Sequence, residues 1–304
     1  MELGLQWPPR VESLSVRPNG AGRVFFVRST GADTNNGLEP ETPFQTVTYA
    51  LTQCTDGGND YIVLMNNTSA LEASFPIVIA KSFIHLIGMW GAPYPNPTLM
   101  ADDDNPTIRI EDGTTWVEIG GIDFGGGATN GCIQIGSDVG NTSYIWIHHC
   151  SFGWDAGIGA QDGIRWLLTH PDAQTYVEDC HFGGLLTRDG CRLDGNNTRG
   201  VYRRNIFRDI QGVGINVNVN GADVGAILDN VFASPIADAL GNGWGILFIV
   251  GAGCALVMGN VGGQTGDATG TSPFVDLSTG AIGTKLNMWA GNIVANAFAN
   301  PDNA

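Results

Sequence analysis

A short phrase built around phenylalanine recurs along this chain and constrains its fold more than any other feature. The copies include VEIGGIDFG, IWIHHCSFG, YVEDCHFGG, VYRRNIFRD and AILDNVFAS. Each copy alternates apolar and polar residues between Gly, Asn and Asp turns, which is the periodicity of β-strands. The phenylalanines are spaced by 28, 30, 25 and 25 residues, and Gly262 and Val294 continue the series after Phe124, Phe152, Phe182, Phe207 and Phe232.

A second apolar position repeats downstream in each unit, with intervals that follow those of the phenylalanines: Ile133, Ile164, Cys191, Ile215 and Ile246. A unit of this length cannot bury its inward side chains alone, whereas stacked units share one continuous core. Leucine-rich and ankyrin repeats have similar lengths but require a helix in each unit, and these segments offer none. The pattern therefore predicts a β-solenoid whose coils stack at the strand spacing of about 4.8 Å.

With these repeats, the N-terminal segment FFVRSTGADTNNGLEPETPFQTVTYALTQC, followed by GGNDYIVLMNNT, resembles the pectate-lyase-like superfamily. The resemblance implies an all-β fold: a single-stranded right-handed parallel β-helix with a short N-terminal capping helix. We expect Thr42 to be the N-cap and Pro43 the first helical residue, with the helix closing the open end of the coil. Polygalacturonase-like members of the superfamily carry Asp-Asp and His-Gly motifs, which find no counterpart here outside the loop sequence ADDDNP.

These patterns predict three parts of the chain: an extended arm at 1–23, the β-helix at 24–295 and a tail at 296–304. The arm contains Trp, Pro and an early acidic residue but no apolar core of a secretory signal, so we expect none. The apolar run at 244–259 is too short and too rich in glycine for a membrane helix. We interpret it as two buried strands.

Charge excludes several classes of partner. The chain has 30 acidic and 14 basic residues, a net charge of −16, whereas nucleic acids and anionic membranes require a basic surface. Six cysteines without a CxxC motif favour free buried thiols in a reducing compartment.

The basic residues are concentrated in one stretch, where seven arginines alternate with aspartates: Arg165, Arg188, Arg192, Arg199, Arg203, Arg204 and Arg208. In DGIR and DGCR, strand alternation points Ile164 and Cys191 inward, so Arg165 and Arg192 point outward from adjacent coils. Two such guanidiniums repel unless carboxylates or an anionic ligand lie between them.

Three interpretations of this stretch stay open. It is a surface ladder of ion pairs, or a groove for a carboxylated or sulfated glycan, or a catalytic site. The glycan-binding candidates are Trp154, Asp155, Trp166 and Arg188. The catalytic candidates are Asp162 and Asp189 as a carboxyl pair, with Arg165 and Arg192 beside them.

The position two residues before each phenylalanine forms a predicted structural ladder of Cys150, Cys180, Asn205, Asn230, Asn260 and Asn292. Asn tolerates left-handed backbone angles, and its amide can hydrogen-bond to the Asn of the next coil. Cys150 and Cys180 lie one coil apart, so reduced thiols, a disulfide and a shared metal all remain open. His149 and His181 do not share a position, which makes a metal the least favoured of the three, and we name no metal ligands.

Two functions from different classes follow. The first is a non-catalytic virion component of the capsid-decoration or tail-spike kind, assembled in the host cytoplasm and displayed on the virion surface. We expect it to form a homo-oligomer, a trimer by analogy with spikes, to contact other virion proteins through residues 1–23 and to bind surface glycans. The alternative is a secreted polysaccharide lyase or glycoside hydrolase acting on an acidic glycan. We expect no cofactor, with calcium binding left open.

Overall fold

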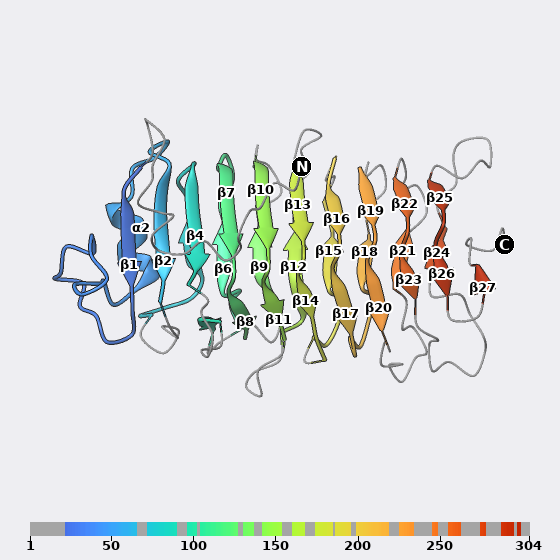
Figure 1. Ribbon diagram of the computed structural model, residues 1–304, viewed down its shortest axis with the longest axis horizontal. Helices are drawn as coiled ribbons and strands as arrows, with labels where there is room; N and C mark the ends of the chain where they lie inside the picture. Colours follow the sequence, from blue (N-terminus) through green and yellow to red (C-terminus); the bar gives the residue numbers. More distant parts are fainter. Residues whose placement is uncertain are drawn as a thin grey trace, which may run out of the picture.

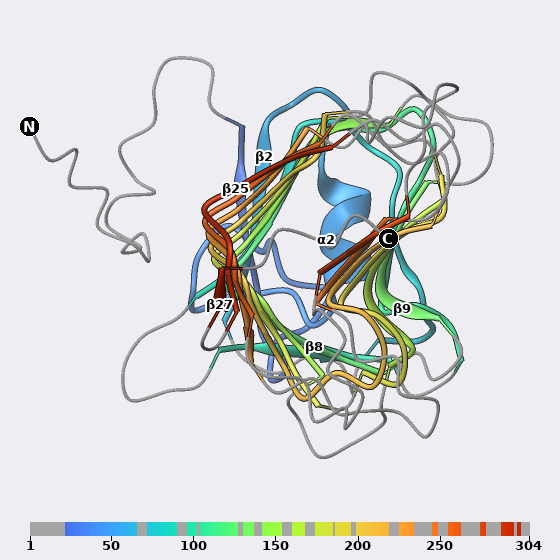
Figure 2. The ribbon, with the colours of Figure 1, turned by 90° about the vertical axis from the view of Figure 1, so that its right-hand side faces the viewer.

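The computed structural model describes residues 22–65, 72–89, 96–101, 104–126, 130–136, 142–153, 160–167, 174–184, 186–195, 199–218, 225–233, 245–248, 255–262, 274–277, 287–294 and 297–298. Within these residues, three β-sheets run side by side along the molecule, and one helix lies beside β1 and β2, at the end where the sheets begin (Figure 1). Viewed along the long axis, the strands of each sheet superpose and enclose a common interior (Figure 2). The predicted fold class, a parallel β-helix with a short N-terminal helix, is confirmed.

The ten-stranded sheet contains β1 (Val24–Val27), β2 (Asp60–Leu64), β4 (Ile84–Gly88), β7 (Thr115–Gly120), β10 (Ser143–His148), β13 (Thr175–Glu178), β16 (Val201–Arg203), β19 (Ala226–Leu228), β22 (Leu256–Met258) and β25 (Met288–Ala290). The nine-stranded sheet contains β5 (Thr98–Met100), β8 (Asp123–Gly125), β11 (Ser151–Phe152), β14 (His181–Phe182), β17 (Ile206–Arg208), β20 (Val231–Ala233), β23 (Val261–Gly262), β26 (Ile293–Val294) and β27 (Ala297–Phe298). The eight-stranded sheet contains β3 (Ile77–Ile79), β6 (Ile108–Ile110), β9 (Gly131–Ile135), β12 (Asp162–Trp166), β15 (Cys191–Leu193), β18 (Ile215–Val217), β21 (Ile246–Phe248) and β24 (Phe274–Asp276).

The repeated phenylalanines form one interior stack, in the register that their spacing predicts. Neighbouring rings from Phe124 to Phe232 lie parallel, with centroids 5.4, 4.7, 4.6 and 4.8 Å apart. The series continues through the pairing of Phe232 with Gly262 and of Gly262 with Val294. Each buried ring contributes about 1.5–3 kcal/mol of hydrophobic stabilisation. The stack therefore aligns successive coils as well as filling the core.

The asparagine ladder is continuous through the C-terminal coils. The side-chain amides of Asn205, Asn230 and Asn260 each donate to the side-chain oxygen of the next member, over 3.0, 2.9 and 2.9 Å. Each amide also donates to a backbone carbonyl of the preceding coil, as Asn230 does to Tyr202. All the ladder asparagines are buried, so these hydrogen bonds replace water that cannot reach them.

The reason expected for asparagine at this position, its tolerance of a left-handed backbone, is wrong. The left-handed residue is the one before it, and these residues are His149, Asp179, Arg204, Asp229, Gly259 and Gly291. Asparagine is suited to the ladder position because its side chain both donates and accepts a hydrogen bond.

Helix α2 (Val47–Gln53) packs Val47, Ala50 and Leu51 into the end of the core. Its N-cap is Thr46, whose hydroxyl accepts from the Tyr49 amide, so the predicted start at Thr42 and Pro43 is wrong. The chain stays extended for longer because Phe44 pairs with Val27 of β1. No helix among the described residues is long and apolar enough to cross a membrane.

Candidate functional site

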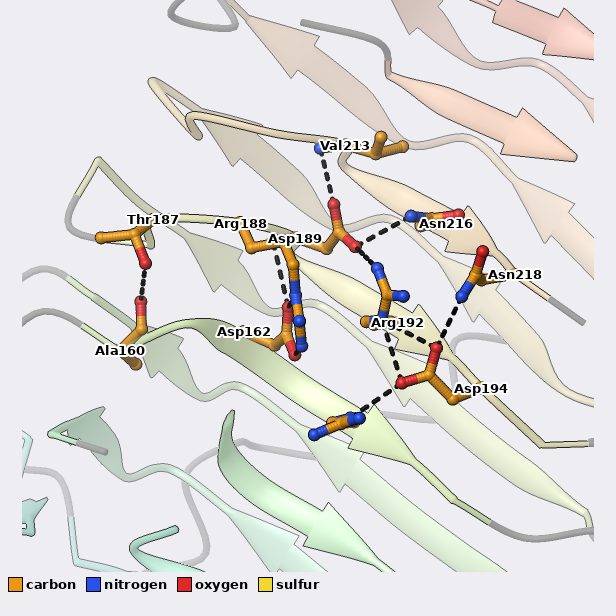
Figure 3. Close-up of polar contacts among 11 residues, drawn as sticks. Ala160, Asp162, Thr187, Arg188, Asp189, Arg192, Asp194, Val213, Asn216 and Asn218 are labelled. Atoms are coloured by element: carbon orange, nitrogen blue, oxygen red, sulfur yellow. Dashed lines mark hydrogen bonds and ion pairs between the residues drawn. The ribbon is translucent and has the colours of Figure 1, made fainter. Parts of the chain in front are cut away.

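Part of the predicted arginine and aspartate cluster lies along the eight-stranded sheet, where Arg165, Arg188 and Arg192 pair with aspartates (Figure 3). Arg165 and Arg192 are register neighbours in β12 and β15, as expected from the alternation. Both guanidiniums donate to Asp194, and Arg192 also donates to Asp189 over 2.9 Å. Asp162 accepts from Arg188 Nε at 2.8 Å and from the Asp189 amide. The carboxylates thus lie between the guanidiniums, which removes the repulsion between them.

Burial limits what this cluster can do. The side chains of Asp162 and Asp189 are 0% and 1% exposed. Burial raises the pKa of Asp189, although hydrogen bonds from the Val213 amide and Asn216 oppose the shift. Burial also acts to raise the pKa of Asp194, but hydrogen bonds from Asn218, Arg192 and Arg165 outweigh it and the pKa is lowered. A catalytic carboxyl must reach its substrate, so this geometry favours a structural ladder.

The concentration of arginines in the sequence does not produce one surface. Arg165 and Arg192 belong to the eight-stranded sheet, Arg203 to the ten-stranded sheet and Arg208 to the nine-stranded sheet. The arginines span more than one coil, so they are divided among different sides of the solenoid. Among the described residues, these arginines therefore do not line the single groove that one of the three interpretations requires.

One glycan-binding candidate is overturned by its burial. Trp166 is fully buried, and its indole Nε1 donates to the Thr175 hydroxyl over 3.3 Å. Two residues after the inward Ile164, it shares the inward face of β12, so it offers no surface to a ligand. Arg188 is partly exposed and pairs with Asp162. Trp154 and Asp155 lie outside the described residues.

Cys150 and Cys180 are free, buried thiols. Each sulfur lies 3.3 Å from a carbonyl oxygen, that of His148 for Cys150 and that of Glu178 for Cys180. Burial raises the pKa of the Cys180 thiol well above its usual value. Donation to a carbonyl and a raised pKa are the properties of reduced thiols within the ladder, and they disfavour thiolates that would bind a metal.

A different surface, which the sequence patterns had not singled out, is shaped to hold a ligand. We call it the aromatic groove: a hollow of about 560 Å³ over β4, β7, β10 and β13 of the ten-stranded sheet. Its lining residues are Asn59, Phe83, His85, Trp116, Val117, Glu118, Tyr144, Trp146, Tyr176 and Glu178. Trp116 and Trp146 are 50% and 40% exposed, so two large rings are held in contact with solvent.

The aromatic residues along one side of the groove occupy one repeat position. Phe83, Trp116 and Tyr144 immediately precede Ile84, Val117 and Ile145, which are register partners. Their rings stack, with centroids 5.9 Å apart for the first pair and 4.4 Å for the second. All three backbones are left-handed, with φ of 58°, a conformation that is uncommon for bulky residues and costs about 1–3 kcal/mol. The same backbone recurs at the turn before the ladder, at His149 and Asp229 among others, so this row is distinguished by the bulky aromatic residues that adopt it.

The polar floor of the groove is centred on Glu118. Its carboxylate accepts from His85 Nδ1 at 2.6 Å and from His148 Nε2 at 2.9 Å. Burial opposes ionisation of the carboxyl, but the hydrogen bonds from His148 and His85 outweigh it and lower the pKa of Glu118 to about 2. Glu178, also in the lining, pairs with Arg203 and Arg204. The floor therefore presents fixed carboxylates to a ligand.

Glu118 makes the stability of the protein depend on pH. Because its folded pKa of about 2 lies below the usual value of 4.5, its contribution is complete above the unfolded pKa and is lost as the pH falls from 4.5 toward 2. We expect Glu118→Gln to remove on the order of 3 kcal/mol of this acid-dependent stability. Urea unfolding across this range tests it, with Glu39→Gln at an exposed position as the control. Equal acid sensitivity in wild type and Glu118→Gln would contradict the assignment.

The groove could have been found from the sequence by extending the repeat alignment. Trp116 and Tyr144 stand eight residues before Phe124 and Phe152, so aromatic residues share an offset in successive coils. The left-handed backbone that lifts them away from the core has no such signal, because Phe, Trp and Tyr are not typical of it.

The described residues contain no group of three or more His, Cys, Asp or Glu side chains placed to hold a metal ion. The expectation that the protein uses no cofactor stays untested. Whether it binds calcium stays an open question.

Comparison with known proteins finds structural neighbours but no family. No protein family model matches the chain, and no curated protein matches it. Among solved structures, the chain is similar to the pectate lyase Pel9A, with a TM-score of 0.48 and 14% identity over 92% of this chain and 79% of that one. It is also similar to a substituted variant of a pectate lyase from Xanthomonas campestris, with a TM-score of 0.45 and 14% identity over 84% and 78% of the two chains. At such low sequence identity, the similarity to these structures concerns the fold alone. The strand pairing defines that fold independently.

Proposed function

We propose that this protein is a non-catalytic, glycan-binding β-helix whose aromatic groove holds a saccharide chain. The observation that carries the proposal is the row of Phe83, Trp116 and Tyr144, kept exposed by left-handed backbones at one position of three successive coils. Packing of the hydrophobic core does not explain why three aromatic rings are held outside it in contact with solvent. The apolar faces of sugar rings, in contrast, pack against aromatic side chains while their hydroxyl groups seek a few fixed acceptors.

The polar groups of the groove support binding without turnover. Glycoside hydrolysis requires one carboxyl that is protonated when the substrate binds. The pKa of Glu118 is about 2, so this side chain is an ionised acceptor and not an acid. Glu178 is engaged by the guanidiniums of Arg203 and Arg204.

The ionised Glu118 favours a neutral glycan over the acidic glycan of the enzymatic alternative. Glu118 lines the groove, whereas the charge of Glu178 is already met by Arg203 and Arg204. No Lys or Arg is among the described lining residues. A uronate chain would bring like charges together, and the net charge of −16 adds to the repulsion.

The test is a binding screen of neutral oligosaccharides, cellohexaose and chitohexaose among them, against polygalacturonate and hyaluronate. We expect the neutral ligands to bind more tightly, and Trp146→Ala to weaken their binding at least about 10-fold. Leu38→Ala, an exposed apolar residue outside the groove, is the control. Stronger binding of the acidic polymers would contradict the neutral preference, and binding insensitive to Trp146 would contradict the groove.

An assay for reducing sugars and unsaturated products over the same panel tests the enzymatic alternative. We expect no turnover. Turnover that is lost in Asp189→Asn would overturn the proposal in favour of the Asp162 and Asp189 pair. The location on a virion surface stays a prediction, and the contact of residues 1–23 with other virion proteins stays one too, because residues 1–21 lie outside the described part of the chain.

A further inference from the structure

The chain enters the described part of the molecule beside the aromatic groove. The backbone amide of Gly22 donates to the carbonyl oxygen of Asn59 over 3.1 Å, and Asn59 lines the groove. A Cβ added to Gly22 would overlap that carbonyl group, so glycine allows the two backbones to approach this closely. The point at which residues 1–21 join the solenoid is therefore fixed at one end of the groove.

This point also lies in line with the aromatic row. One register position of successive coils holds Gly22, Asn59, Phe83, Trp116 and Tyr144. The three coil steps from Asn59 to Tyr144 cover about 14 Å at the usual strand spacing, and an extended chain covers that distance with about five residues. Trp7 stands 15 residues before Gly22, so the chain that precedes Gly22 is long enough to reach every part of the row.

The sequence LQWPPR at 5–10 complements the lining of the groove. Proline-rich segments dock into grooves lined by aromatic residues, because proline is restricted before it binds and loses little conformational entropy. Trp7 adds a large apolar ring directly before the two prolines. Arg10 directly after them supplies the positive charge that would pair with the ionised Glu118, in a groove with no Lys or Arg among its described lining residues.

Charge does not oppose this contact. In residues 1–21, Glu2 and Glu12 balance Arg10 and Arg17, so the net charge of −16 belongs entirely to the rest of the chain. A segment without net charge is not repelled by the acidic body of the protein.

We infer that residues 1–21 fold back over the ten-stranded sheet and occupy the aromatic groove of the same chain, with the Trp-Pro-Pro sequence against the aromatic row and Arg10 facing Glu118. Attachment at Gly22 makes the docking intramolecular, with an effective concentration on the order of millimolar. A modest intrinsic affinity is therefore enough to keep the groove covered.

The docked segment would be an autoinhibitory contact, a consequence that rests on the proposed function. A saccharide would have to displace residues 1–21 before it could reach Trp146. The effect of Trp146→Ala on saccharide binding is therefore best measured in a chain that also carries Trp7→Ala, because its groove is open.

Limited proteolysis of the full-length protein with trypsin tests the docking. The proline after Arg17 blocks cleavage there, so Arg10 is the one good tryptic site in residues 1–21. Cleavage after Arg10, followed by mass spectrometry, should be at least about 10-fold slower than in a free peptide of residues 1–21, because the protease cuts only the undocked state. Trp146→Ala should restore most of the peptide's rate. Leu38→Ala, exposed outside the groove, should leave the protection unchanged.

Two substitutions within the segment make the result specific. Trp7→Ala should remove the protection and Trp7→Phe should keep most of it, each compared with a free peptide of the same sequence so that the preference of the protease cancels. Dilution of the protein about 100-fold should not change the protection, because the docking is intramolecular.

Cleavage of the wild type at the rate of the free peptide would overturn the inference. Protection that persists in Trp146→Ala would also overturn it, and protection that is lost on dilution would place the segment on another copy of the chain. The assay contains no saccharide, so its result does not depend on whether the groove binds a glycan.

Discussion

Replacing Asn230 with alanine is expected to lower the free energy of unfolding by about 3–5 kcal/mol. The Asn230 side-chain oxygen accepts from both the backbone and side-chain amides of Asn205, and its amide donates to Tyr202 and Asn260. Alanine would remove all four hydrogen bonds. It would leave the buried backbone amide of Asn205 and one hydrogen of its side-chain amide without an acceptor, and each unsatisfied group costs about 1–3 kcal/mol. Urea unfolding measures the total loss, and hydrogen exchange at the Asn205 amide measures it locally.

Two further variants make this result specific to the ladder. Asn230→Asp keeps the acceptor but cannot donate to Tyr202 and Asn260, so it should be destabilising as well. Arg208→Ala, whose side chain is exposed and pairs with the exposed Asp209, should change stability by less than about 0.5 kcal/mol. If Asn230→Ala lies within about 1 kcal/mol of wild type, the ladder does not hold the coils together.

Replacing Trp116 with asparagine is expected to separate binding from stability. Removing this half-exposed ring from the middle of the row should weaken binding of the best neutral oligosaccharide about 10- to 100-fold, as for an aromatic residue at the centre of a binding surface. Stability should change by less than about 1 kcal/mol, because two effects offset each other. The stacking contacts with Phe83 and Tyr144 are lost, while asparagine adopts the left-handed backbone with less strain.

The matched control for Trp116→Asn is Phe152→Leu in the interior stack. Phe152 is fully buried between Phe124 and Phe182, so its loss should destabilise the coil and leave the groove residues in place. Calorimetric titration and thermal unfolding of both variants give the comparison. A Trp116→Asn variant that unfolds far more readily than wild type and binds normally would mean that the aromatic row is structural.

Much of the fold follows from residues that recur at fixed offsets. The spacing of the phenylalanines from Phe124 to Phe232 predicted the interior stack. The inward positions of Ile164 and Cys191 predicted that Arg165 and Arg192 are outward neighbours. Both predictions are confirmed by the ring stacking and the strand register. The helix start was misplaced because Thr42-Pro43 is a good N-terminal signal locally, whereas the pairing of Phe44 with Val27 is a long-range contact. Local propensity yields to such contacts when the two compete.

The candidate site was less accessible to sequence reasoning. Arginines close in the sequence suggested one groove, yet the coil carries Arg165, Arg203 and Arg208 to three different sheets. Asp162 and Asp189 were candidates for a catalytic carboxyl pair and are buried in ion pairs. The residues of the aromatic groove come instead from distant segments, such as Asn59 and Tyr176.

The repeat in the sequence specifies which side chains point inward and how successive coils align. Every strand of a solenoid faces the same core, so inward positions carry a repeating apolar signal that needs no knowledge of the other coils. The folded structure was needed to show which outward side chains from distant segments line one groove. Outward residues are divided among three sheets by turns whose backbone angles leave little trace in residue type, as the left-handed Phe83, Trp116 and Tyr144 show. The core could therefore be predicted from the repeat, whereas the groove was identified in the folded structure.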